Sequence, residues 1–143
     1  MTDRLYATFY IDDTLFGIDA TDVQEVLRAQ PMTSVPLAPA DIKGLINLRG
    51  QIVVAVDLRE RLGRGPAPDD VQSLNVVVRT EHGPVSLIVD DIGDVLKVSD
   101  DALERPPETI TSPTRDLVVA VHKLDEQLML VVDAKRTAEP MAA

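Results

Sequence analysis

The sequence contains no cysteine and no long apolar run, and each absence excludes a class of protein. Without cysteine, neither a disulfide framework nor a thiolate metal site can hold the fold, which is compatible with a reducing compartment. The longest strongly apolar stretches, Ile52 to Val56 and Leu128 to Val132, span only five residues, whereas a membrane-spanning helix needs ~20. The N-terminus also lacks the basic start and apolar run of a signal peptide. We therefore expect a soluble cytoplasmic protein without direct membrane insertion.

Aromatic residues and positive charge are scarce as well. Only four aromatics occur, and all of them lie in the first sixteen residues. Apolar residues still make up 45% of the 143 residues, so the core must be built mainly from aliphatic side chains of one compact unit or two very small ones. The formal net charge of -10 argues against nucleic acid as a partner, because phosphate contacts depend on a basic surface.

Residues that carry out chemistry are also missing from the usual patterns. The two histidines, His82 and His122, have no neighbour at a metal-ligand spacing, and there is no nucleophile motif or phosphate-binding glycine loop. Adjacent acids such as Asp12-Asp13 and Asp90-Asp91 fit turns better than paired acid and base, because neighbours in a strand point to opposite faces. We expect no catalysis, no metal and no cofactor.

Short β-rich runs separated by turn residues recur along the chain. The expected strand pairs are Leu5 to Ile18 around Asp12-Asp13, Leu45 to Leu48 with Gln51 to Asp57, Asn75 to Arg79 with Val85 to Val89, and Leu117 to His122 with Gln127 to Val132. Apolar residues three and four apart predict short helical turns. These turns are Val23 to Leu27, Leu58 to Leu62 and Ile92 to Leu96. A further turn at Ala38 to Lys43 could be closed by Gly44 as its C-terminal cap.

The two halves of the chain resemble one another. QIVVAVD at 51–57 lies over QLMLVVD at 127–133 with a spacing of 76, and DVQEVL at 22–27 lies over DIGDVL at 91–96 with a spacing of 69. We infer an internal duplication and a mainly β fold of two small packed barrels, in which closure removes exposed strand edges. The expected division is a single domain, 1–143, with subdomains 5–66 and 67–136, terminal strands that can cross over, and a flexible tail at 137–143.

The segment Ile42 to Leu58 combines an apolar hairpin with polar residues that the fold does not require. Arg49 stands at the expected reversal and should project outward. An arginine on apolar strands is either an anchor for a protein partner or an ordinary solvated turn residue, and spacing alone leaves both open.

This segment, extended by one residue to IKGLINLRGQIVVAVDLR, resembles the signature of the CheW family of bacterial chemotaxis coupling proteins. The likeness covers roughly Leu5 to Arg136. It includes FGID at 16–19, VQEV at 23–26, IVDDIGDVL at 88–96 and the closing KLD and VD at 123–125 and 132–133. The chain departs from the family at Val54, where proline is usual, near Ala120, where glycine is usual, and at Ala134, where a leucine follows the aspartate.

The resemblance implies two packed five-stranded barrels of Src-homology-3-like type with short helices. It also implies a non-catalytic protein that bridges the cytoplasmic tips of chemoreceptors and the regulatory domain of the histidine kinase CheA, recruited to membrane receptor arrays through these partners. The receptor-binding positions implied by matching motifs are Val23, Glu25, Lys43, Gly44, Arg49 and Val95. The resemblance assigns no residues to the kinase contact.

Two other interpretations stay open at the level of sequence. A CheW-like paralogue could serve a non-flagellar pathway, such as twitching motility or development, and a regulatory domain could be detached from a larger kinase or response-regulator fusion. The start at Met1 and the Ala-rich end favour a free-standing adaptor.

Overall fold

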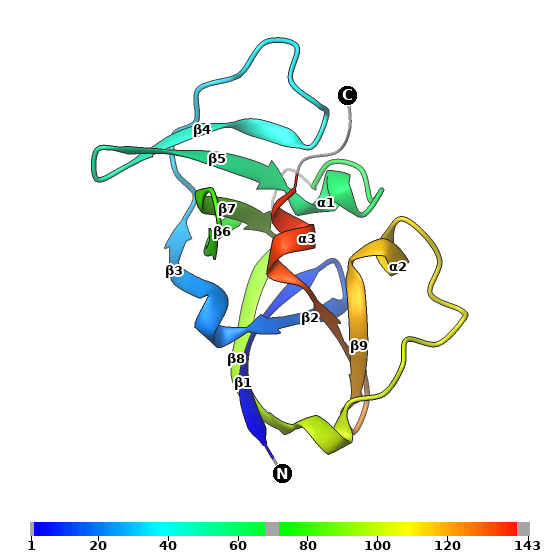
Figure 1. The fold of residues 1–143 in the computed structure, drawn as a ribbon. Helices are drawn as coiled ribbons and strands as arrows, with labels where there is room; N and C mark the ends of the chain where they lie inside the picture. Colours follow the sequence, from blue (N-terminus) through cyan, green and yellow to red (C-terminus); the bar gives the residue numbers. More distant parts are fainter. Residues whose placement is uncertain (1, 68–71, 140–143) are drawn as a thin grey trace.

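The computed structural model describes residues 2–67 and 72–139 and contains two five-stranded sheets (Figure 1). The first sheet has the order β8-β1-β2-β10-β9. Its strands are β1 (Asp3–Ile11), β2 (Thr14–Asp19), β8 (Asp91–Ser99), β9 (Val118–Lys123) and β10 (Leu128–Val132). The second sheet has the order β3-β6-β7-β5-β4. Its strands are β3 (Val23–Arg28), β4 (Ile42–Leu48), β5 (Gln51–Asp57), β6 (Leu74–Thr80) and β7 (Gly83–Val89).

Short helices connect or follow these strands. They are α1 (Leu58–Arg61), α2 (Thr114–Leu117), α3 (Ala134–Ala138) and the 3-10 turns η1 (Ala20–Asp22) and η2 (Asp100–Ala102). The expected mainly β fold of two five-stranded, Src-homology-3-like units is confirmed. The expected closure is not complete, because each sheet has two edge strands that no ladder joins within the described residues. The units are therefore curled open sheets.

The hairpin at Arg49-Gly50 forms as the sequence predicts. Arg49 has a φ of 53° and Gly50 a φ of 87°, and positive φ at both central residues is the mark of the type I′ turn that best matches strand twist. The side-chain oxygen of Asn47 accepts a hydrogen bond from the Gly50 amide at 2.9 Å. This bond explains a polar residue in an otherwise apolar strand.

Two expected helical turns are wrong, since Val23 to Leu27 and Ile92 to Leu96 lie in the edge strands β3 and β8. Each strand has a β-bulge against its neighbour, between Val23 and Glu25 in β3 and at the β1 residues Ala7 and Phe9 that pair with β8. In each strand two neighbouring apolar residues point to opposite faces. Leu27 and Leu96 pack against the smaller apolar clusters, while Val26 and Val95 are exposed. Apolar residues three and four positions after Val23 and Ile92 therefore occur without a helix.

The other two expected helical turns have opposite outcomes. The segment Ala38 to Lys43 is not a helix. It contains a single turn, in which the Ile42 amide donates to the Pro39 carbonyl at 3.0 Å, and β4 begins at Ile42. The helix after β5 is confirmed as α1, and the Asp57 carboxylate caps it by accepting from the Arg59 amide at 3.0 Å.

The inferred duplication extends to the strand register. Val54 of β5 lies opposite Val85 of β7 in a parallel pair, and Leu130 of β10 lies opposite Phe16 of β2 in the same way. The spacings are again 76 and 69 residues. The repeat unit is therefore a hairpin followed by three strands, β1–β5 and then β6–β10.

The boundary between sheets does not follow the expected boundary between 5–66 and 67–136. The hairpin β1–β2 joins strands β8–β10, while β3–β5 join the hairpin β6–β7. The hairpin of each half therefore completes the sheet of the other half, through the parallel pairs of β2 with β10 and of β7 with β5. Of the segment expected as a flexible tail, Thr137 and Ala138 are buried in α3, and residues 140–143 lie outside the described part.

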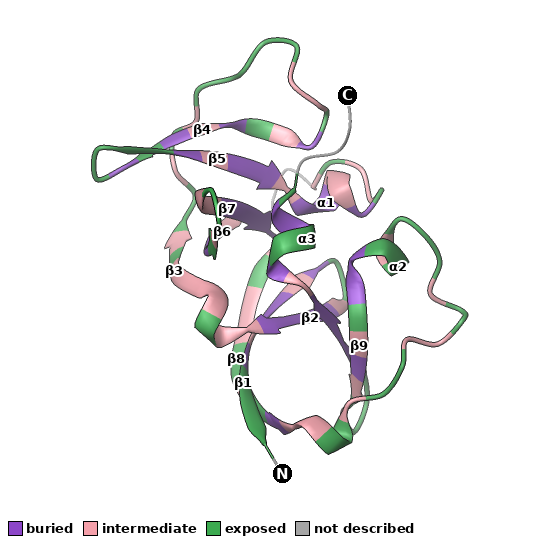
Figure 2. Ribbon diagram, in the orientation of Figure 1, coloured by how far each residue is buried: buried purple, intermediate pink, exposed green. Residues whose placement is uncertain are grey.

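The largest apolar cluster takes its buried residues from both sheets, and Figure 2 colours buried residues purple on strands of each. At its centre the rings of Phe9 and Phe16 stack with centroids 5.7 Å apart. Smaller clusters lie elsewhere in each sheet, one around Met129 and one around Val53. Phe9 and Phe16, from β1 and β2, thus contribute to the cluster shared by both sheets, whereas Tyr6 and Tyr10 belong to the cluster around Met129.

Candidate functional site

The arginine of the β4–β5 turn forms an ion pair with β3. Arg49 Nη1 donates to Glu25 Oε1 at 3.0 Å, and Nη2 makes a second hydrogen bond to Oε2. Gln24 donates to the same carboxylate at 3.2 Å. Strands β3 and β4 are the two opposite edges of the second sheet, so this forked pair brings the sheet's edges toward one another.

A backbone bridge closes the same side of the sheet. Thr33, in the loop after β3, exchanges two hydrogen bonds with Leu45 of β4, at 2.9 and 2.8 Å. Gly44 makes this approach possible, because a Cβ at residue 44 would lie 2.7 Å from the Thr33 carbonyl oxygen. Gly44 is buried, so it can influence a partner only through the backbone that it positions.

The ion pair favours the ionised form of the Glu25 carboxyl group. The hydrogen bonds from Arg49, then from Gln24, lower the pKa of the Glu25 carboxyl from its ordinary value. The Arg49 side chain is nevertheless 65% exposed. A guanidinium has five N–H donors, of which Glu25 takes two, so the remainder can face an acidic or carbonyl-bearing partner.

The other candidate positions differ in their exposure and in the sheet to which they belong. Lys43 is exposed on β4, and Val23 is half-buried against the inter-sheet core. Val95 is 61% exposed but belongs to β8, the edge strand of the other sheet, opposite Ala7. The structure therefore joins Glu25 directly to Arg49, keeps Lys43 and Gly44 on the same hairpin, and places Val95 on the first sheet.

Sequence reasoning missed one exposed apolar residue beside this site. Val26 of β3 is 44% exposed and is the counterpart of Val95 in the repeat. The alignment of 22–27 with 91–96 already contained this signal. The repeat therefore presents an exposed valine on an edge strand of each sheet.

A partly buried ion-pair network around the buried Arg59 was also missed. Arg59 Nη1 lies 2.6 Å from Asp12 Oδ1 and 2.6 Å from Asp90 Oδ2, and Nε donates to the Gly65 carbonyl at 3.0 Å. The Asp90 carboxylate also accepts from the Asp12 amide at 2.7 Å. Arg59 thereby fastens α1 to the β1–β2 turn and to the link between β7 and β8, and its hydrogen bond lowers the pKa of Asp12.

The described residues contain no group of three or more histidine, cysteine or acidic side chains that could hold a metal ion. In the same part of the chain, no helix has the length and apolar character needed to cross a membrane. His122 Nδ1 lies 3.5 Å from the Ala102 carbonyl, and His82 borders a surface cavity. The arrangement of exposed charge and apolar edge strands suits contact with other proteins.

Comparisons with known proteins agree with this geometry. The model of the CheW-like domain matches residues 5–139. The chemotaxis protein CheW of Rhizobium meliloti is 30% identical over 130 residues, covering 91% of this chain and 84% of that protein. The chemotaxis protein CheW of Bacillus subtilis is 28% identical over 133 residues, covering 93% and 85%.

A solved structure extends the likeness to three dimensions. The scaffolding protein TtCheW of Thermoanaerobacter tengcongensis has a TM-score of 0.86 and 27% identity to this chain, with 98% of each chain covered. Because the family model spans nearly the whole sequence and the fold matches over the same length, the chain belongs to the CheW-like domain family.

Proposed function

We propose that this chemotaxis adaptor couples the cytoplasmic tips of chemoreceptors to the regulatory domain of the histidine kinase CheA. It would act in the cytoplasm and reach membrane receptor arrays through its partners. Membership of the CheW-like family supports a non-catalytic scaffold. The alternative is a detached regulatory domain; the relatives named above, of which this chain covers 84% and 85%, carry the name of chemotaxis proteins.

The observation that carries the proposal is the Arg49–Glu25 pair. It orients an exposed guanidinium at the tip of a rigid hairpin, and pre-oriented arginines are common anchors of protein interfaces. We propose a receptor surface made of two parts, the hairpin side and the exposed edge of β8. Its residues are Val23, Glu25, Lys43, Gly44, Arg49 and Val95.

Binding of a purified receptor-tip fragment tests this surface. Val95→Asp puts a charge on an exposed apolar position, so the fold is retained while a docked partner would have to bury a carboxylate. We expect at least a tenfold weaker affinity by titration calorimetry. The control is Val119→Asp, on an exposed position of β9, which should bind normally; equal affinities for both variants would contradict the proposed surface.

The same architecture would serve a CheW-like paralogue of a non-flagellar pathway. The kinase that co-purifies with the tagged chain from its native cell identifies the pathway. Recovery of a chemotaxis CheA supports the main proposal, and recovery of a kinase of a twitching or developmental system supports the paralogue.

A further inference from the structure

A cavity of about 470 Å³ lies at the end of the first sheet where β1 begins and β2 ends. This volume is in the range of small-molecule sites, about 300–1,000 Å³. Part of the wall is apolar and includes Leu103 and Val119. The polar part of the wall consists of Arg4, Tyr6, Asp19, Asp22, Asp100 and Asp133. Among the described residues that line the cavity, four carboxyl groups therefore share a single arginine.

Arg4 is bonded to two of these four carboxylates. Its Nη1 donates to Asp19 Oδ2 at 3.2 Å, and its Nε donates to Asp100 Oδ1 at 3.1 Å. Asp19 Oδ1 also accepts from the amide and the hydroxyl of Thr21, at 2.9 and 2.8 Å. These contacts hold the guanidinium beside Asp19 and Asp100, so Asp22 takes no part in its hydrogen bonds.

Asp22 is a carboxylate without a bonded partner. Within the described residues, its side chain forms no hydrogen bond and no ion pair. Burial, followed by the negative charges of Asp19 and Asp133, raises the pKa of the Asp22 carboxyl. The positive charge of Arg79 opposes this effect, but its Nη1 donates to two backbone carbonyls, at 3.0 and 3.2 Å. A cation bound beside Asp22 would relieve the repulsion among the carboxylates.

Tyr6 provides an independent sign of a ligand. Its side chain is 4% exposed and packs in the cluster around Met129, yet its hydroxyl forms no hydrogen bond within the described part of the chain. Tyr6 lies directly opposite Asp19 in the ladder of β1 and β2 and lines the cavity. Buried hydroxyls are normally hydrogen-bonded, and a hydroxyl can accept from an N–H group. A bound N–H donor would therefore satisfy Tyr6.

The repeat contains an internal comparison for Tyr6. Asn75 of β6 occupies the equivalent position at the spacing of 69. Its Nδ2 donates to the Arg28 carbonyl at 3.2 Å, and its Oδ1 accepts from the Ser86 hydroxyl at 2.8 Å. The polar side chain at this position of the second sheet is thus satisfied within the chain, whereas the Tyr6 hydroxyl is not.

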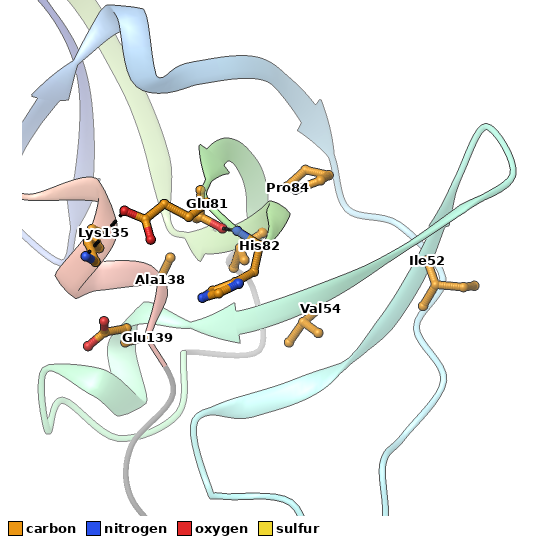
Figure 3. A pocket seen from close by; sticks show the side chains of 10 residues that line it. Ile52, Val54, Glu81, His82, Pro84, Lys135, Ala138 and Glu139 are labelled. Carbon is orange, nitrogen blue, oxygen red and sulfur yellow. Dashed lines mark hydrogen bonds and ion pairs between the residues drawn. The ribbon is translucent and has the colours of Figure 1, made fainter.

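The cavity between β5 and α3 offers a comparison for Asp22. There Lys135 Nζ lies 3.6 Å from Glu81 Oε1, and Figure 3 shows these two side chains facing one another. Glu81 therefore has the cationic partner that Asp22 lacks among the described residues.

We propose that the cavity at Tyr6 and Asp22 binds an organic cation on an apolar stem, the alkylguanidinium or alkylammonium chemistry of an arginine or lysine side chain. The charged end would lie between Asp22, Asp133 and the Tyr6 hydroxyl. The stem would pack on Leu103 and Val119. A guanidinium suits the site best, because its five N–H donors can reach separate acceptors. A basic side chain of a partner protein and a free polyamine share this chemistry.

Nuclear magnetic resonance titrations of the full chain test the site with defined probes. n-Butylguanidinium should bind saturably, with a dissociation constant on the order of 1 mM for so small a ligand. Guanidinium without a stem should bind ~10-fold more weakly, because it buries less apolar surface, and butanol should not bind. Blocked arginine, which stands for a protein side chain, is then compared with spermidine, and the tighter ligand identifies the source of the cation.

Three variants locate the binding of n-butylguanidinium. Asp22→Asn keeps the shape of the side chain and removes its charge, so it should weaken binding ~10-fold. Tyr6→Phe keeps the packed ring and should weaken binding ~2- to 10-fold. The matched control Asp101→Asn removes the same charge from an exposed residue outside the cavity wall and should change the affinity less than ~2-fold.

Stability distinguishes a ligand site from a structural role for Asp22. Because its raised pKa means that the charged form disfavours folding, unliganded Asp22→Asn should resist urea at least as well as the parent at neutral pH. Saturation with n-butylguanidinium should lower the pKa of Asp22. The proposal is overturned if the parent does not bind this probe saturably, if Asp22→Asn and Asp101→Asn bind it equally, if Asp22→Asn unfolds at a lower urea concentration than the parent, or if magnesium ions displace the probe at equal concentration.

Discussion

Arg49 at the tip of one hairpin holds Glu25 of a strand at the far edge of the same sheet, with Arg49 Nη1 3.0 Å from Glu25 Oε1. Hydrogen bonding between neighbouring strands does not close the sheet, so this pair and the Thr33 to Leu45 bridge fix its curl. The residue at the centre of the proposed receptor surface therefore also shapes that surface. Whether Arg49 acts by shaping the surface or by contacting the receptor can be decided by experiment.

Reversing the charge of Arg49 should abolish receptor-dependent kinase activation. Arg49→Glu places two carboxylates together, yet Arg49 is exposed, so a cooperative thermal unfolding transition should persist. Activation is measured as phosphate transfer by the reconstituted kinase. The double variant Glu25→Arg with Arg49→Glu remakes the pair in reverse. Recovery of activation would assign Arg49 a positioning role, and continued loss would assign it direct contact; unchanged activation by the single variant would contradict both.

The ion pair also predicts a dependence of stability on pH. Arg49 lowers the pKa of Glu25 in the folded state, so the pair stabilises the fold above the ordinary pKa of glutamate and ceases to do so as pH falls through the lowered value. An NMR titration of the Glu25 carboxyl should give a lower pKa in the parent than in Arg49→Met. Identical titrations would show that the pair does not persist in solution.

Gly44→Ala should destabilise the protein. The added methyl would lie 2.7 Å from the Thr33 carbonyl oxygen, and forcing the loop away from β4 should cost about 1–3 kcal/mol. Urea unfolding measures the loss. Lys43→Ala, at the exposed neighbouring position, should change stability by less than ~0.5 kcal/mol; similar losses for both variants would contradict the role given to Gly44.

The repeat supplies a matched control for the network at Arg59. Arg59→Met leaves the nearly buried carboxylate of Asp90 without its cation, which should cost about 3 kcal/mol. Lys135 occupies the equivalent position and pairs with Glu81, but the two side chains are 65% and 73% exposed, so Lys135→Met should have almost no effect. Equal unfolding free energies for the two variants would refute the assignment.

The hairpins could be predicted because local turn chemistry specifies them. Arg49-Gly50 and Asp12-Asp13 lie between alternating runs, and the structure places reversals at both. Strands β3 and β8 could not be read in this way, because both carry apolar residues on their exposed face as well as on their packed face, and these residues together imitate a helical spacing. These segments are extended because β3 pairs with β6 and β8 pairs with β1, and both partners are distant in sequence.

The sequence allowed terminal strands to cross over but did not predict that a whole hairpin of each half is exchanged. The alignment of 51–57 with 127–133 establishes a repeat, but a repeat is equally compatible with each half folding on itself. Likewise, motif matching gave Arg49 and Glu25 separately but not their ion pair, since nothing in the order of residues 25 and 49 shows that opposite sheet edges meet. Arg59 was missed because Asp12 and Asp90 looked like ordinary turn acids.

Co-sedimentation with receptor tests the central claim most directly. Purified kinase, membranes bearing receptor tips and this chain are mixed in all combinations, and the kinase that pellets is measured together with its activity. The account predicts that kinase pellets and is activated only when the chain is present, and that Arg49→Glu reduces both. Kinase that pellets equally without the chain, or a chain that binds neither component, would contradict a coupling function.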